Sequence, residues 1–128
     1  MQTEQTFLRC TICGNLVGVI HDSGVSMVCC GEDMVRLAAN ETDGAAEKHV
    51  PVARQAGQTV IVRVGAVDHP MLPEHHIEWI YLLTKEGGQR KRLQPSDAPT
   101  AQFCVTEGDD PLSCYAYCNL HGLWRGTV

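Results

Sequence analysis

Six short segments of the chain alternate apolar with polar side chains, and this pattern constrains the fold more than any other feature. Successive side chains of a β-strand point to opposite faces, so the alternation predicts strands that bury one face. No stretch carries a convincing helical stripe of apolar residues. Short strands separated by turns at spacings of about ten residues are typical of an all-β, immunoglobulin-like antiparallel sandwich. The six segments are residues 49–54, 58–65, 76–83, 89–93, 101–106 and 113–117.

Two of these segments indicate which side chains share one face of a strand. Val60, Val62 and Val64 are expected to share one face of the segment 58–65. In the segment 76–83, one face is expected to carry Ile77, Trp79, Tyr81 and Leu83.

Two cysteines lie inside predicted strands. Cys104 stands between Phe103 and Val105 and is expected to be a small buried apolar side chain. Cys114 precedes Cys118 by four positions on the same strand face. We expect Cys114 to be an inert core thiol, and the alternative is an oxidation-sensitive neighbour of a metal site.

Four more cysteines, Cys10, Cys13, Cys29 and Cys30, define a smaller module near the N-terminus. Predicted strands at 16–21 and 25–28, joined by a turn at 22–24, fold the second pair of cysteines back onto the first. Adjacent side chains of a regular strand point apart, so Cys29 and Cys30 share one ion only if the backbone bends there. An all-sulfur tetrahedral site holds zinc or iron, so a structural zinc ribbon stays an alternative.

The composition limits the class of protein. The 128 residues hold one ordinary domain or two modules, and the polar linker at 38–48 favours modules at 1–37 and 38–128. Seven cysteines, no signal-like start and no membrane-length apolar run favour metal ligation in the cytoplasm, away from the membrane. The net charge of -5 argues against nucleic acid as a partner, and the basic run 90–92 is expected to be a solvated strand face.

A second metal site is predicted from one cysteine and several histidines. Cys118 and His121 are separated by two residues, so a single loop can direct a thiolate and an imidazole at one ion. Loops cluster at the ends of a sandwich, which brings the other histidines within reach. Five ligands exceed the four of a structural zinc site and favour a redox ion such as iron. The other candidates are His49, His69, and either His75 or His76, because strand alternation lets only one of these two neighbours face the ion.

These motifs resemble those of a known family. The spacing of Cys10 and Cys13 followed by Cys29-Cys30 resembles the desulforedoxin-type iron centre. Four further blocks resemble, in the same order, those of the desulfoferrodoxin-type, two-iron superoxide reductases. These blocks are Glu47-Lys48-His49-Val50-Pro51, His69-Pro70-Met71, His75-His76-Ile77-Glu78-Trp79-Ile80 and Cys118-Asn119-Leu120-His121-Gly122.

The resemblance implies two irons per chain and a homodimer. It implies a first iron held by Cys10, Cys13, Cys29 and Cys30 in a desulforedoxin-like module. In the sandwich it implies a second iron with Cys118 as the axial ligand and His49, His69, His75 and His121 as equatorial ligands. It thereby selects His75 over His76, which stands where the family has an aromatic residue.

The implied activity is the one-electron reduction of superoxide to hydrogen peroxide at Fe(II), with a small redox protein such as rubredoxin restoring the electron. Lys48 is expected to attract the superoxide anion and to hold a water that donates a proton. The resemblance implies that Glu47 occupies the sixth position of the oxidised resting iron. Two other functions stay open: a dismutase-like enzyme, and a non-enzymatic, metal-stapled module for electron transfer or binding.

Overall fold

The computed structural model describes residues 3–42 and 44–128, which divide into two compact units. One unit is Glu4–Ala38, and the other spans residues 39–128 and includes Thr3. Among the described residues, the regular secondary structure of both units is β-strand apart from one helical turn, Ala46–His49, in agreement with the predicted all-β class. No helix among the described residues is long and apolar enough to cross a membrane.

The N-terminal unit contains two small sheets. Its three-stranded sheet has the order β2-β1-β5, and β1 pairs antiparallel with both neighbours. A separate two-residue hairpin joins β3 to β4. The strands are β1 (Thr6–Arg9), β2 (Leu16–Val19), β3 (Val28–Cys29), β4 (Glu32–Asp33) and β5 (Val35–Arg36).

The strand predicted at 25–28 is wrong, since only Val28 lies in a strand and β2 pairs with β1 instead. Val25 and Met27 are exposed, so placing them in a paired strand would bury little apolar surface. The carboxylate of Asp22 accepts a hydrogen bond from the Gly24 N–H at 2.8 Å, and this local turn competes with strand formation. β1 was not predicted, because four residues are too short to show a period.

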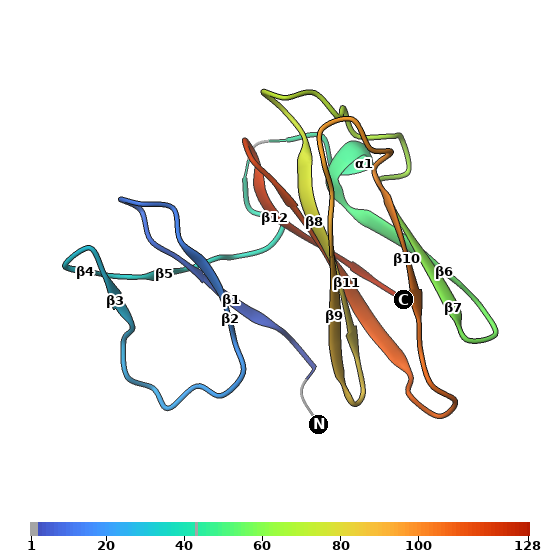
Figure 1. Ribbon diagram of the computed structural model, residues 1–128, viewed down its shortest axis with the longest axis horizontal. Helices are drawn as coiled ribbons and strands as arrows, with labels where there is room; N and C mark the ends of the chain where they lie inside the picture. Colours follow the sequence, from blue (N-terminus) through green and yellow to red (C-terminus); the bar gives the residue numbers. More distant parts are fainter. Residues whose placement is uncertain (1–2, 43) are drawn as a thin grey trace. The chain divides into compact units, whose positions relative to one another are not determined.

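The larger unit is a sandwich of seven antiparallel strands in two sheets (Figure 1). One sheet has the order β10-β7-β6, and the other has the order β12-β11-β8-β9. The first sheet consists of β6 (Pro51–Ala56), β7 (Thr59–Val64) and β10 (Thr100–Cys104). The second consists of β8 (Ile77–Thr84), β9 (Gly87–Arg92), β11 (Pro111–Cys118) and β12 (Gly122–Thr127). Of these seven strands, β12 alone was not predicted.

The core lies between the two sheets. Val60, Val62 and Val64 are fully buried in it, which confirms their shared inward face. The opposite sheet contributes Leu82 and Ile80 to the same cluster. Arg90, Lys91 and Arg92 are exposed on β9, as expected of a solvated strand face.

The predicted face of β8 is wrong at one position. Ile77 belongs to the core cluster with Ile80, whereas Trp79 stacks on Tyr117 with ring centroids 5.7 Å apart. The cause is an irregularity in the ladder, where Tyr117 pairs with Trp79 but Cys118 pairs with Ile77. The extra residue on β8, Glu78, forms a bulge that reverses the alternation.

The two strand cysteines differ in burial. Cys104 is exposed, so the expectation of a buried side chain is wrong: Phe103 and Val105 take the inward positions, and the residue between them points outward. Cys114 is fully buried, as expected of a core thiol, and burial raises the pKa of its thiol to about 12.

Candidate metal centres

Five possible metal ligands from three separate connections meet at one end of the sandwich. His49 ends the single helical turn α1 (Ala46–His49), and His69 and His75 lie between β7 and β8. Cys118 ends β11, and His121 follows in the turn to β12. One ligand atom from each of these five residues lies within 4.8 Å of every other. The short strands thus bring together residues up to 72 positions apart in the chain.

The four imidazoles form a closed circle. Neighbouring rings cross at angles between 70° and 85°. The rings of His49 and His75 lie opposite each other, with centroids 6.4 Å apart. Around the circle, the centroid distances are 4.6 Å for His49–His69, 4.6 Å for His69–His75, 5.1 Å for His75–His121 and 4.8 Å for His49–His121. Four equatorial ligands of one ion have this arrangement.

The sulfur of Cys118 completes the group from the core side. It lies 3.4 Å from Nε2 of His69 and 3.7 Å from Nδ1 of His121. The side chain is fully buried and belongs to the hydrophobic cluster of the sandwich. Burial raises the pKa of this thiol, and the backbone N–H groups of Leu120 and His121 act in the opposite direction.

Backbone carbonyl groups orient two of the rings. Nδ1 of His49 lies 2.8 Å from the Ala45 carbonyl oxygen, and Nδ1 of His69 lies 2.7 Å from that of Pro70. With the proton on Nδ1, each ring leaves the Nε2 lone pair free to face inward. Burial lowers the pKa of His49 and His75, and lowers that of His69 to about 4. The lowered pKa values favour the neutral form of these three rings, which is the form that binds metals.

The spacing of the donor atoms fits a transition-metal ion. Metal–nitrogen bonds of about 2.0–2.1 Å at right angles place neighbouring nitrogens about 2.9 Å apart. Nε2 of His49 lies 3.1 Å from Nε2 of His69 and 3.1 Å from Nδ1 of His121. Nε2 of His75 is buried and has no hydrogen-bond partner among the residues that the structure describes. Buried polar atoms are rarely left without a partner, and a bound ion would satisfy this one.

The four N-terminal cysteines form a second group, again with ligand atoms within 4.8 Å of one another. Cys10 follows β1 and Cys13 lies in the next turn, while Cys29 and Cys30 come from the β3–β4 hairpin. The backbone φ is +53° at Cys30 and +76° at Gly31. Positive φ at both central residues is typical of tight hairpin turns, and it supplies the bend that the adjacent cysteines require.

Hydrogen bonds from backbone N–H groups favour the thiolate form of one sulfur in this second group. The Cys13 N–H donates to Sγ of Cys10 at 3.5 Å. Such bonds from the backbone N–H groups of Cys13 and Ile12 lower the pKa of Cys10 to about 6. Sγ of Cys13 lies 3.6 Å from Sγ of Cys29, close to the roughly 3.8 Å expected for a tetrahedral site with metal–sulfur bonds of about 2.3 Å.

Glu47 and Lys48 are exposed on α1, directly before the buried His49. The carbonyl oxygen of Glu47 accepts a hydrogen bond from the Val67 N–H at 2.8 Å. Burial is the main cause of the lowered pKa of His49, and the positive charge of Lys48 contributes. An ammonium group close to the imidazole circle suits the attraction of an anion.

Asn119 has a structural role that the sequence did not predict. Its side chain binds the backbone on both sides of His75, through Glu74 and His76. The position of Asn119 between Cys118 and His121 is the only hint in the sequence. His76 lies outside the ligand group, and its Nδ1 is 3.1 Å from the Leu72 carbonyl oxygen.

An immunoglobulin-sized sandwich with a four-histidine, one-cysteine group, preceded by a four-cysteine unit, defines a class of proteins with two non-haem iron sites. The family model for desulfoferrodoxin matches residues 41–127, and the model for the desulfoferrodoxin N-terminal domain matches residues 2–37. The chain belongs to the desulfoferrodoxin family.

Known relatives support this assignment. The chain is 43% identical over 128 residues to a desulfoferrodoxin from Nitratidesulfovibrio vulgaris, covering 100% of both chains. It is 45% identical over 117 residues to a desulfoferrodoxin homolog from Archaeoglobus fulgidus, covering 91% of this chain and 92% of the relative. The crystal structure of the superoxide reductase from Treponema pallidum matches with a TM-score of 0.83 and 40% identity, covering 97% of this chain and 99% of that chain.

Proposed function

We propose that this protein is a superoxide reductase. The single observation that carries the proposal is the circle of four imidazoles with one buried thiol behind it. Superoxide takes up one electron and two protons to give hydrogen peroxide, and Fe(II) bound by these residues supplies the electron. Neutral imidazoles and one thiolate leave such an ion with a net charge of +1, which favours a small anion.

The ligand assignment is also part of the proposal. His49, His69 and His75 bind through Nε2, and His121 binds through Nδ1, because these nitrogens face one another. Cys118 would hold the iron from the core side, and its thiolate would donate electron density to the iron. In the N-terminal unit, the iron ligands are Cys10, Cys13, Cys29 and Cys30. The functional border between the two iron modules falls after residue 37.

Lys48 attracts the substrate and delivers a proton, and Glu47 acts on the oxidised iron. Lys48 attracts superoxide and holds the water that delivers a proton, since its ammonium is exposed beside the site. The Glu47 carboxylate, a hard ligand that suits Fe(III), would serve as a further iron ligand in the oxidised resting state. Both roles are supported by the position of the two residues next to His49 on an exposed helical turn.

The proposed partners are superoxide, a small redox protein such as rubredoxin, and a second copy of this chain, all in the cytoplasm. The N-terminal unit exposes an unusual share of large apolar side chains for its size, which supports a homodimer. These side chains are Ile12, Ile20, Val25, Met27, Val28 and Val35.

The decisive experiment follows superoxide decay by stopped flow, with the iron-loaded protein and with or without a reduced donor. The proposal expects one superoxide consumed per ferrous centre without the donor, and sustained turnover with it. Continued turnover together with oxygen release in the absence of a donor would instead indicate a dismutase. Colourless protein that retains one zinc per chain and leaves superoxide unchanged would indicate a non-enzymatic module.

A further inference from the structure

The turn that carries Glu47 and Lys48 has little stability of its own. It consists of the four residues Ala46–His49, and none of the side chains that the structure describes caps its N-terminal end. One isolated helical turn fixes several backbone dihedrals for a single hydrogen bond, so it is unstable without outside support. The positions of Glu47 and Lys48 therefore depend on what contacts this turn.

The outside support comes from residues 65–68, which follow β7. The Val67 N–H donates to the Glu47 carbonyl oxygen at 2.8 Å. Gly65 lies against the same backbone, since a Cβ atom at Gly65 would lie 2.7 Å from the Glu47 carbonyl oxygen and 2.9 Å from that of Val50. Only glycine allows this approach, so the loop and the turn fit together closely.

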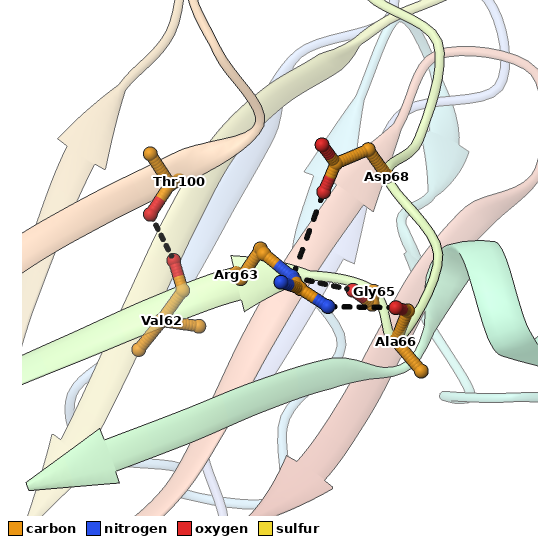
Figure 2. Close-up of polar contacts among 6 residues, drawn as sticks. All are labelled: Val62, Arg63, Gly65, Ala66, Asp68 and Thr100. Atoms are coloured by element: carbon orange, nitrogen blue, oxygen red, sulfur yellow. Dashed lines mark hydrogen bonds and ion pairs between the residues drawn. The ribbon is translucent and has the colours of Figure 1, made fainter.

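Arg63 holds this supporting loop in place (Figure 2). Its Nε donates to the Gly65 carbonyl oxygen at 3.1 Å, and its Nη2 donates to that of Ala66 at 2.6 Å. Nε also lies 3.5 Å from a carboxylate oxygen of Asp68. A planar guanidinium can satisfy several acceptors in a fixed geometry, whereas a lysine ammonium acts as a single point charge.

Arg63 is not needed for the core. Its neighbours Val62 and Val64 point inward, whereas the arginine side chain is 54% exposed. The Thr100 hydroxyl, which donates to the Val62 carbonyl oxygen at 3.1 Å, ties β10 to β7 independently of Arg63 (Figure 2). Replacing the guanidinium should therefore leave the sandwich folded while loosening the loop.

We propose that Arg63 is a positioning residue that places Glu47 and Lys48 beside the iron site through the loop 65–68. This inference rests on the proposed superoxide reductase activity, in which these two residues contact the reacting anion or the iron. Arg63 acts through the hydrogen bond between Val67 and Glu47 and touches no reactant itself.

The test uses the iron-loaded full chain and the charge-conserving variant Arg63→Lys, with Arg54→Lys as the matched control. Arg54 is exposed on β6, on the same outward face of the same sheet. Because the net charge is unchanged, weaker long-range attraction of superoxide cannot explain an effect. Hydrogen exchange of the segments 65–69 and 59–64 is measured by mass spectrometry, together with the second-order rate constant for superoxide.

In Arg63→Lys, exchange in the segment 65–69 should rise about tenfold, while that in 59–64 stays unchanged. The rate constant should fall roughly three- to tenfold, and Arg54→Lys should match the parent in both measurements. Unchanged exchange in 65–69 would overturn the inference, and so would faster exchange with an unchanged rate constant. If the parent protein fails to reduce superoxide, the proposed function fails, which the exchange data distinguish from failure of the loop contact.

Discussion

The side chain of Asn119 brackets His75 by binding the backbone immediately before and after it. Nδ2 donates to the Glu74 carbonyl oxygen at 2.9 Å, and Oδ1 accepts from the His76 N–H at 2.9 Å. The Asn119 N–H adds a longer bond to the His76 carbonyl oxygen at 3.2 Å. The loop that carries His75 is thereby tied to the turn that follows Cys118.

Asn119→Ala is therefore expected to weaken iron binding at the four-histidine site by roughly 10- to 100-fold, since groups that orient ligands affect metal affinity to this extent. Competition with a chelator, followed through the visible band of the ferric thiolate, measures the change. Asn40→Ala is the control, because the Asn40 side chain also makes two hydrogen bonds to backbone groups, the N–H and the carbonyl oxygen of Arg125. Equal iron retention by the two variants would contradict the bracketing role.

Lys48→Ala should slow the reaction with superoxide by about two- to tenfold at low ionic strength, because an exposed ammonium beside the site increases the encounter rate. The difference from the parent should shrink as salt screens the charge. Stopped-flow rates across a salt series provide the measurement. Lys91→Ala, an exposed lysine on β9, serves as the control. A parallel salt dependence in Lys48→Ala and the parent would exclude steering by Lys48.

Glu47→Ala should shift the visible spectrum of the resting ferric protein while changing the first encounter with superoxide by less than about twofold. The reason is that a carboxylate suits Fe(III) and contributes little to a ferrous ion that must accept an anion. Absorption spectra of the oxidised protein test this expectation, with Glu107→Ala as the control, because Glu107 is an exposed carboxylate in the loop between β10 and β11. If the Glu47→Ala spectrum is identical to that of the parent, then Glu47 is not the sixth ligand.

Cys104 and Cys114 should differ sharply in reactivity in the folded, iron-loaded protein. Iodoacetamide should modify the exposed Cys104, whereas Cys114 should react only after unfolding, because it is buried and its thiol has a pKa of about 12. Peptide mass spectrometry identifies the labelled residue, and Cys104→Ser provides the control. Labelling of native Cys114 at the rate of Cys104 would show that the core around it opens readily.

Features that repeat along the chain were predictable from the sequence. The alternating valines of β7 gave both the strand and its buried face, because burial of one face requires a period of two. Cys118 ends a strand and the four candidate histidines lie in connections at the same end of the sandwich, so short strands place all five near one another. The family blocks then selected His75, which lies in the ligand group, over His76, which does not.

Features without a repeating pattern were not predictable. The bulge at Glu78 reverses the side of β8 on which Ile77 lies, and one inserted residue leaves no periodic signal. β1 has only four residues, and in β12 the neighbouring residues Leu123 and Trp124 are both buried, so neither strand shows a period of two. Asn119 and Arg63 act by binding distant backbone groups, and such bonds depend on loop geometry that no local motif encodes.

Cys118 is a fully buried member of the hydrophobic cluster of the sandwich, whereas His75 and His121 are only partly buried. The sulfur of Cys118 therefore lies against hydrocarbon, whereas the imidazole rings of His75 and His121 are partly accessible to water. Water and oxidants that would attack the thiolate are excluded by the same packing that stabilises the fold. A mutation that lets water into the core near Cys118 should therefore alter electron donation by its thiolate before it unfolds the chain.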